Sequence, residues 1–453
     1  MGKNHSVNDV CGFFWNIEKK YNLLNRSING IYIWQALRID VYYKLTAKIG
    51  LFTPPAPPRK KTIMGRALKL LTEFYYFVFN NPFLKTKNTD TAVLLHPRKI
   101  SRQDIYSSSL LKEFKRINKD IYIFDVMGSP ENDYVTFDPY KKAAHIWAVI
   151  NKKYISLSPA DLEVIKNIEQ EIYSEYAVRL DLLPLIKYNI INFKFLLAVY
   201  RKFLRQKKVK KLYVVVGYVN TPLIAAAKSV NTEVIELQHG IITKYHLGYS
   251  YPDKGNIHYM PDKLLCFGKY WYESTPLPSN TKTAVLGAPF ILEPGKKYSA
   301  QKEKNSVLFV SQGVIGEKLF NFALQTAKIL PSYNIKFNPH PSENYNDYEK
   351  LFSENTLKNF SLTEKKYNIF ELLAMSEYQA GVFSTTLFEG MVLNTKIILI
   401  DMAGSEYMAP VIEKKDAILV KTPEELALKI NTAGLAANIS DYYAQPADKI
   451  TDL

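Results

Sequence analysis

The sequence predicts an α/β protein with two Rossmann-like lobes, each built around a parallel sheet. Two series of short apolar runs alternate with helical stretches, the first between residues 91 and 287 and the second between residues 306 and 420. This alternation is typical of parallel strands that are connected by helices. With 453 residues, the chain is long enough for two or three domains of ordinary size.

The first series supplies the predicted strands of the first lobe. They cover residues 91–95, 120–126, 212–217, 232–238, 263–268 and 284–287, and a long helical region is expected from about 161 to 206. Residues 293–305 are polar and charged and contain Pro and Gly, so this segment is expected to be the linker between the lobes.

The second series supplies the strands of the second lobe. They cover residues 306–312, 334–341, 378–384, 396–401 and 417–420. We therefore expect three parts: an amphipathic helical N-terminal extension (1–88), a first lobe (89–295) and a second lobe (296–453). In parallel sheets of this kind, ligands bind beyond the carboxyl ends of the strands, and candidate site residues are expected there.

Cysteine usage and the start of the chain indicate the compartment. Cys11 and Cys266 are the two cysteines, and neither belongs to a CxxC or Cys/His spacing, so neither a disulfide framework nor a structural zinc site is expected. The first ten residues lack the order of a signal peptide, and no run reaches about 18 uninterrupted apolar residues. We therefore expect a cytoplasmic protein.

The charge of the chain calls for an anionic partner. The net charge is +16, and residues 1–90 hold 14 Lys or Arg against 5 Asp or Glu in a stretch rich in aromatic residues. Two stretches of helical apolar spacing, 31–52 and 64–79, flank the stiff proline-rich segment Pro54 to Lys61. Their aromatic faces indicate either contact with an anionic membrane surface or packing on the main body, and the sequence leaves both open.

The first polar cluster follows the strand at 232–238. Gln238, His239 and Gly240 come directly after it, and His246, Tyr249 and Tyr251 follow nearby. Gly240 permits a close backbone approach, and His239 would be displayed at the carboxyl edge of the sheet. A single histidine at a strand end is also a common structural hydrogen bonder.

The second cluster, Asn338 to Glu343, closes the strand at 334–341. Prolines on both sides of His340 restrict the backbone and hold the imidazole in an extended geometry, where it can donate to a phosphate or carboxylate. The alternative is a loop that is merely punctuated by proline.

The third cluster, Phe383 to Gly390, joins a strand to a helix. Its hydroxyl residues Ser384, Thr385 and Thr386 occupy the cap and first turn, where backbone N–H groups and the helix dipole attract phosphate. Glu389 lies one turn further on, within reach of a ribose hydroxyl pair. A plain Ser/Thr helix cap would have the same sequence.

Taken together, across residues 90 to 430, these clusters resemble the GT-B glycosyltransferases of bacterial capsule and lipooligosaccharide assembly. The matching motifs are LQHG (237–240), NPHPSE (338–343), STTLFEG (384–390) and KIILID (396–401). This broad set includes the polysialyltransferases and related sialyltransferases with a His-Pro motif, the Kdo transferases and the CDP-glycerol glycerophosphotransferases. The resemblance implies two lobes with the acceptor on the first and a nucleotide-sugar donor on the second.

The resemblance also assigns roles to the second-lobe motifs. His340, with Pro341, would contact the donor phosphate, Ser384, Thr385 and Thr386 would hold the same phosphates, and Glu389 would face the ribose. The expected donor is a CMP-activated nonulosonic acid or Kdo, otherwise a UDP-sugar, and the expected acceptor is a surface glycan or a lipid-linked glycan. Neither a metal ion nor a resident cofactor is expected, because no DxD pair or carboxylate cluster stands at a strand end. Such an enzyme would lie peripherally on the inner face of the cytoplasmic membrane.

The base of the first lobe remains open at this point. The related enzymes usually carry an acidic motif there, and the candidates in this chain are Glu236 and Asp104, with His239 as a further proton acceptor. A second His-Pro pair, His96-Pro97, lies in the first lobe and fits an acceptor contact or a structural loop.

Three other functions fit parts of the sequence. A UDP-sugar 2-epimerase shares the two-lobed form but needs no basic aromatic extension. A non-catalytic scaffold of a glycan assembly complex would keep the extension. Nucleic-acid binding is disfavoured, because the basic run 201–211 closes a helix and no recognised nucleic-acid-binding motif occurs.

Overall fold

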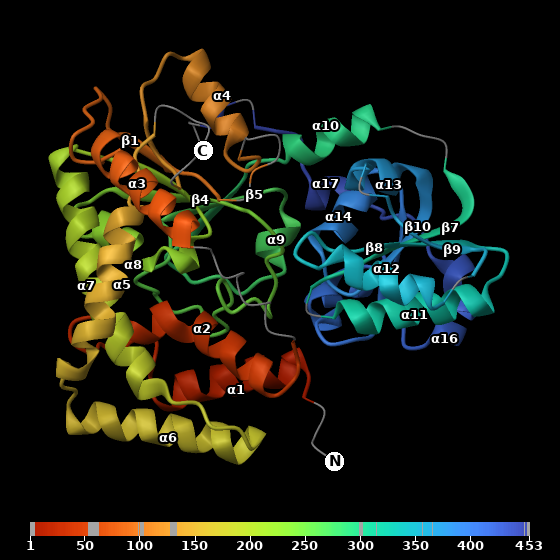
Figure 1. Cartoon of the computed structure of the whole chain (residues 1–453), viewed down its shortest axis with the longest axis horizontal. Helices are drawn as coiled ribbons and strands as arrows, with labels where there is room; N and C mark the ends of the chain where they lie inside the picture. Colours follow the sequence, from red (N-terminus) through yellow and green to blue (C-terminus); the bar gives the residue numbers. More distant parts are fainter. Residues whose placement is uncertain are drawn as a thin grey trace.

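The computed structural model describes residues 5–52, 63–97, 99, 104–126, 134–298, 302–313, 315–355, 357–364, 366–447 and 449–450, with the backbone alone for 63–70. Two six-stranded sheets, both fully parallel, form the two lobes (Figure 1). The predicted two-lobed α/β architecture is therefore confirmed, and it is the arrangement of the GT-B fold. The predicted link from Pro54 to Lys61 lies outside the described residues.

The first sheet has the strand order β2-β1-β3-β4-β5-β6. Its strands are β1 (Thr91–Leu94), β2 (Tyr122–Phe124), β3 (Lys211–Val215), β4 (Glu233–Leu237), β5 (Lys263–Cys266) and β6 (Lys282–Val285). All six fall within the predicted apolar runs or begin within two residues of them. The strands are nearly continuous in buried residues, as expected for a parallel sheet covered on both faces.

Helices cover both faces of this sheet. They are α4 (Ser108–Arg116), α5 (Asp138–Asn151), α6 (Pro159–Tyr176), α7 (Leu182–Gln206), α8 (Thr221–Lys228), α9 (Tyr270–Glu273) and α10 (Pro289–Lys297). Helices α7 and α8 share an apolar core with one face of the sheet, and α4 packs on the other. The single helical region expected from 161 to 206 is in fact two helices, because Ala177 takes a left-handed conformation and ends α6.

The second sheet has the order β12-β11-β10-β7-β8-β9. Its strands are β7 (Glu303–Val310), β8 (Asn334–Asn338), β9 (Phe360–Leu362), β10 (Ser376–Gly381), β11 (Lys396–Ile400) and β12 (Ile418–Val420). Its helices are α11 (Gly316–Ile329), α12 (Tyr345–Ser353), α13 (Ile369–Met375), α14 (Thr385–Val392), α15 (Ala409–Glu413), α16 (Pro423–Lys429) and α17 (Ile439–Tyr442). The short edge strand β9 was not predicted.

The segment 293–305, expected as the linker between the lobes, contains the end of one helix and the start of a strand. Helix α10 runs to Lys297 with Pro294 inside it, and β7 already begins at Glu303. The chain also returns to the first lobe at its end, where Ala444 N donates to Phe267 O at 2.9 Å and Ile450 N donates to Glu113 Oε2 at 2.7 Å. An apolar core formed with α9, α14 and α17 joins the two lobes.

The N-terminal extension contains α1 (Val7–Lys20), α2 (Ile33–Lys48) and α3 (Ile63–Phe79). Helices α1 and α2 bury their apolar residues in one core with α6 and α7. For the stretch 31–52, the structure therefore favours packing over membrane contact. Arg38, which interrupts the apolar pattern, is buried against Glu18 at 2.8 Å and donates to the carbonyls of Leu247 and Ser250.

Helix α7 is long and apolar enough to cross a membrane, by length and composition alone, and 33% of its most apolar window is buried. Its inward face packs against α2, α5 and α8, so it forms part of the wall of the first lobe (Figure 1).

Candidate functional site

His239 lies at the carboxyl end of β4, where the chain leaves the first sheet. Its ring nitrogen Nδ1 is 3.4 Å from the hydroxyl of Tyr249. That hydroxyl donates to Oε1 of Glu236 at 2.5 Å, and the same oxygen accepts from Gly217 N at 2.8 Å. The two predicted first-lobe residues, Glu236 and His239, are thus joined through a buried tyrosine.

Burial determines the protonation of this group. It raises the pKa of Glu236 to about 7, although the hydrogen bonds from Tyr249 and Gly217 oppose the shift. It also keeps the Tyr249 hydroxyl protonated, with a pKa well above 10. Burial, together with the nearby His246 and His96, lowers the pKa of His239 to about 3, so its imidazole is neutral.

The hydrogen-bond directions fix how the neutral imidazole is used. Because the Tyr249 hydroxyl gives its single proton to Glu236, its oxygen can only accept from His239. His239 then carries its proton on Nδ1, and Nε2 keeps its lone pair. This is the arrangement of a base whose tautomer is fixed by a second group.

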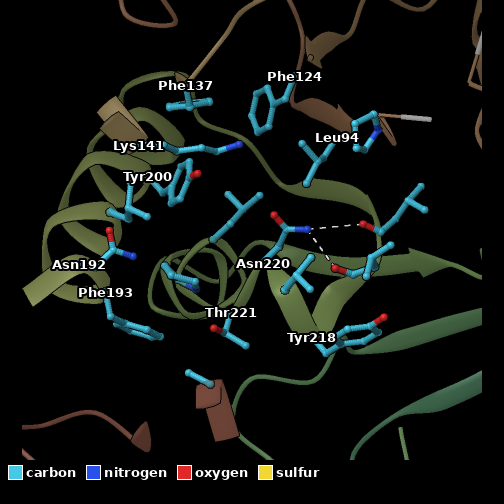
Figure 2. Close-up of a pocket in the computed structure, with 18 of the residues that line it drawn as sticks. Leu94, Phe124, Phe137, Lys141, Asn192, Phe193, Tyr200, Tyr218, Asn220 and Thr221 are labelled. Carbon is cyan, nitrogen blue, oxygen red and sulfur yellow. Dashed lines mark hydrogen bonds between the residues drawn. The ribbon is translucent and has the colours of Figure 1, made fainter. Parts of the chain in front are cut away.

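His239 borders a cavity of about 770 Å³ in the first lobe. The cavity lies beyond the ends of β1, β2 and β3, and helices α2, α5 and α7 form its walls. Figure 2 shows Lys141 reaching from α5 toward Phe124 and Leu94, with Tyr200 beside it. The lining combines aliphatic side chains with aromatic rings and amides, and the rings and amides are Phe124, Phe137, Tyr188, Phe193, Tyr200, Tyr218, Asn189, Asn192 and Asn220.

The backbone under this cavity is strained. Val216 lines the cavity with φ 61°, a conformation that β-branched residues rarely adopt. Asn220 donates to Val216 O at 2.9 Å and stabilises the turn (Figure 2). The next residue must be Gly217, since a Cβ there would stand 2.4 Å from Glu236 Oε2. The turn thus brings a backbone N–H to the buried carboxylate.

Strand ends of the two lobes meet beside His239. A Cβ on Gly240 would be 3.8 Å from the methyl group of Thr385, which begins α14 in the second lobe. Glu389 of α14 acts electrostatically on Tyr443, as does Tyr106 of the first lobe, whose ring lies 6.3 Å from that of His239. Thr385, the first residue of α14, therefore lies beside the first-lobe centre.

Ser384 is the N-cap of α14. Its hydroxyl accepts from Thr386 N at 3.2 Å, so the plain helix-cap interpretation of this motif holds. Ser384, Thr385 and Thr386 are all half-buried at the carboxyl edge of the second sheet. The same position leaves the amino end of α14 directed at the junction of the lobes, where an anion would be stabilised.

His340 lies in a turn of its own after β8. Its Nδ1 accepts from Ser342 N at 3.1 Å, and its backbone N donates to Glu343 Oε2 at 2.5 Å. One strand, β7, lies between β8 and β10 in the sheet, so the ends of these two strands are roughly 10 Å apart at ordinary strand spacing. Pro341 is exposed beside His340.

Glu343 was not singled out by the sequence, although it belongs to the same motif. Its carboxylate accepts from Ser311 Oγ at 3.1 Å and from Tyr348 Oη at 2.6 Å, and so ties the His340 turn to the end of β7. Gln312, also just after β7, accepts through Oε1 from Phe383 N at 3.3 Å and so joins this strand end to that of β10. The sequence Ser-Gln-Gly directly after β7 places polar residues at a strand end, as in the three predicted clusters, and could have marked this position as a candidate.

The remaining first-lobe candidates, Asp104 and His96, differ in their surroundings. Asp104 is buried, and its carboxylate accepts from His96 N at 2.9 Å and from Ser107 Oγ at 2.6 Å, so it joins the residues after β1 to the start of α4. His96 lines the cavity, and its ring lies 6.0 Å from that of His239. Within the described ranges, no three His, Cys, Asp or Glu side chains are grouped so that they could hold a metal ion.

Comparison with known proteins finds no matching family model and no matching curated protein. The solved structures that match include UDP-GlcNAc 2-epimerase from Methanocaldococcus jannaschii in complex with UDP-GlcNAc and UDP, at 14% identity and TM-score 0.43, covering 76% of this chain and 91% of that chain. Acinetobacter baumannii MurG matches at 11% identity and TM-score 0.44, with coverage of 76% and 90%. UDP-GlcNAc 2-epimerase from Neisseria meningitidis bound to UDP-GlcNAc matches at 11% and 0.45, with coverage of 76% and 90%. These values assign neither a reaction nor a substrate to the chain.

Proposed function

We propose that this chain is a glycosyltransferase that moves a sugar from a nucleotide donor to a surface glycan or a lipid-linked glycan. The observation that carries the proposal is the position of His239. Its neutral imidazole, backed by Tyr249 and Glu236, borders a large cavity of the first lobe, next to the point where the amino end of α14 approaches from the second lobe. An acceptor and a donor can therefore meet at one imidazole.

The cavity supports a carbohydrate acceptor. Flat aromatic rings offer stacking surfaces for sugar rings, and Asn189, Asn192 and Asn220 offer both donors and acceptors for hydroxyl groups. Such a mixed lining is typical of a small-molecule site with fixed polar contacts. An acceptor bound there would present one hydroxyl to Nε2 of His239.

The transfer step then follows from the proton positions. Nε2 of His239 takes the proton of the acceptor hydroxyl while that oxygen forms a bond to the anomeric carbon of the donor sugar. The bond from that carbon to the donor phosphate breaks, and the nucleotide leaves with the electron pair. Glu236, as a carboxylate, stabilises the imidazolium through Tyr249, in the manner of a buried carboxylate that orients a catalytic histidine.

The second lobe is the proposed donor side. His340, Pro341 and the Ser384-Thr385-Thr386 turn would bind the phosphates, the amino end of α14 would stabilise the leaving charge, and Glu389 would face the ribose. The first choice of donor remains a CMP-activated nonulosonic acid or Kdo, otherwise a UDP-sugar, with neither a metal ion nor a cofactor. We place the enzyme in the cytoplasm, on the inner face of the membrane.

A thermal-shift screen against CMP, CDP, UDP, GDP and their sugar conjugates tests the donor side. A nucleotide that binds only the native state raises Tm. We expect one nucleotide class to raise Tm, and His340→Ala to lower its affinity about tenfold, the equivalent of one charge-assisted hydrogen bond. His258→Ala, a histidine stacked on Tyr32 away from both strand-end centres, is the matched control.

Two results would contradict the proposal. One is the absence of a shift with every nucleotide. The other is conversion of UDP-GlcNAc alone to its epimer, which needs no acceptor and would indicate a 2-epimerase.

A further inference from the structure

A large apolar surface on the first lobe remains unused by the proposed chemistry. On α3 it comprises Leu71, Phe74, Tyr75, Phe77, Val78 and Phe79, and on α5 it comprises Ile146, Trp147, Val149 and Ile150, with Tyr154 just beyond. We call this surface the α3–α5 face. Each of these side chains is more than a third exposed, and Leu71 and Phe74 reach 69% and 67%.

The two helices form one continuous face. The ring of Phe77 on α3 lies 6.0 Å from that of Tyr140 on α5, and Glu73 forms an ion pair with Lys142. Figure 1 shows α3 lying across one end of α5, with α5 continuing beside α7. An exposed helix side normally carries polar residues, so a face of this size and composition indicates a binding partner.

Packing within the lobe does not explain the apolar side of α5. Its inward face uses the small residues Ala144 and Ala148, which are fully buried. Ile146 and Ile150 point the opposite way on the helix and are each 57% exposed, and Trp147 on the flank is 55% exposed. The bulky apolar residues of α5 are therefore exposed to solvent, whereas the small ones are buried in the core.

The charges around the face select the kind of partner. Asp138 at the start of α5 forms an ion pair with Lys141, and Glu73 of α3 forms one with Lys142. Lys152 and Lys153 follow at the carboxyl end of α5, and residues 139–154 contain no acidic residue. Lys153 lies over the ring of the exposed Tyr154, 4.9 Å from its centroid. Aromatic and aliphatic side chains next to lysines are typical of proteins that rest on anionic lipid headgroups.

The face also adjoins the mouth of the cavity. His145 precedes Ile146 on α5, is exposed, lines the cavity and contacts the Tyr188 hydroxyl at 2.8 Å. Lys141, one turn earlier, lines the cavity as well. One helix thus carries the rim of the cavity and the apolar face.

We propose that the α3–α5 face docks onto an anionic lipid bilayer and that this docking holds the mouth of the cavity at the membrane surface. The docking rests on the exposed side chains alone, whereas the use of the cavity by a membrane-held acceptor rests on the proposed function. The localisation inferred from the sequence named the N-terminal segment. Here α5 supplies four of the eleven side chains of the face, and α1 and α2 supply none of them.

Co-sedimentation with vesicles tests the docking. The probes are vesicles of phosphatidylcholine mixed with phosphatidylglycerol, and vesicles of phosphatidylcholine alone. We expect the wild-type protein to prefer the mixed vesicles and to be released by salt. The combined variant Ile146→Ser, Trp147→Ser and Ile150→Ser should lower the partition coefficient by about tenfold or more, because it removes three side chains that would be buried in the interface.

Matched controls separate the face from general surface hydrophobicity. Leu428 and Leu435 of the second lobe are 84% and 54% exposed, and their change to Ser should leave vesicle binding unchanged. The pair Lys152→Glu and Lys153→Glu should remove the preference for phosphatidylglycerol. Unchanged Tm in each variant confirms that the fold is intact, because all of these positions lie on the surface.

Fluorescence gives a second readout. Trp147 is the exposed member of the four tryptophans, while Trp34 and Trp271 are buried and Trp15 is half-buried. Brominated phospholipid in the vesicles should quench the emission of the wild-type protein, and Trp147→Phe should abolish that quenching while the protein still sediments with the vesicles.

The proposal is overturned if the triple serine variant binds vesicles like the wild-type protein, or if the wild-type protein does not bind them. Dimers of the wild-type protein that this variant dissociates, without vesicle binding, would assign the face to self-association instead. A chain that binds vesicles through this face but responds to no nucleotide would retain the docking and refute the proposed function.

Discussion

The two histidine centres of this molecule stand at equivalent places, just beyond the carboxyl end of a parallel strand, yet their surroundings differ. His239 follows β4, borders a cavity and is linked through Tyr249 to the fully buried Glu236. His340 follows β8 in a half-exposed turn, which is held by Glu343 through its backbone. The proposed function therefore gives proton transfer to the first and anion binding to the second.

The difference lies in what backs each imidazole. A buried carboxylate that reaches the ring through a hydroxyl stabilises the imidazolium and fixes the tautomer. Glu343, by contrast, accepts from the backbone of His340 and leaves the ring to Ser342. The motif sequence alone, His followed by Gly or Pro, does not separate these two roles.

The largest expected effect is on His239. His239→Ala should lower kcat by about 10²- to 10⁴-fold, the usual contribution of a general base, with the nucleotide thermal shift unchanged. His340→Ala should show the reverse pattern: weaker donor binding and a smaller loss of kcat. Turnover measured against donor concentration in both variants tests the comparison. Equal losses of kcat in the two variants would contradict the different roles of the two histidines.

Glu236→Gln is expected to have the next largest effect, and one that depends on pH. Because the pKa of Glu236 is about 7, the fraction of Glu236 in the carboxylate form increases as pH rises through that value. The kcat/KM of the wild-type protein should increase with this fraction. The Gln variant should lose this acid limb, because no carboxylate is left to support the imidazolium. A pH profile with the same limb in both proteins would assign the limb to another group.

The same substitution makes a prediction for stability. The pKa of Glu236 is raised from 4.5 in the native state, so the native state binds more protons than the unfolded state between those values, and the free energy of unfolding falls as pH rises through this window. Relative to the wild-type protein, Glu236→Gln should therefore gain as much as about 3 kcal/mol between pH 4 and pH 8. Denaturant unfolding at the two pH values measures this difference, and a difference that shrinks with pH would have the wrong sign.

The smallest expected effect is on the cap of α14. Ser384→Ala should lower the free energy of unfolding by about 1 kcal/mol, as expected for an N-cap. Thr422→Ala is the matched control, since Thr422 caps α16 by accepting from Glu425 N at 3.2 Å. Both should lose similar stability, but Ser384→Ala alone should weaken nucleotide binding. Equal nucleotide affinity in the two variants would make the Ser384 turn purely structural.

The sequence predicted the sheets well because burial on both faces leaves a strong local pattern. All eleven runs proposed as strands became strands, and β9, only three residues long, was missed. The stretch 31–52 was ambiguous because an amphipathic helix on a membrane and one on a protein core share one periodicity. Packing on the protein core is favoured because Arg38 is buried against Glu18 and the carbonyls of Leu247 and Ser250, and the two carbonyls lie far away in the sequence.

The sequence by itself therefore determined the strands, their parallel connections and the strand ends that carry His239, His340 and Ser384, since periodicity and turn residues are local properties. Tertiary structure alone decided that Tyr249 lies between His239 and Glu236, that α2 and α7 enclose the cavity, and that Gly240 meets Thr385 across the lobes. These contacts join residues from different elements, and their geometry depends on how whole helices and sheets pack, which no local pattern encodes.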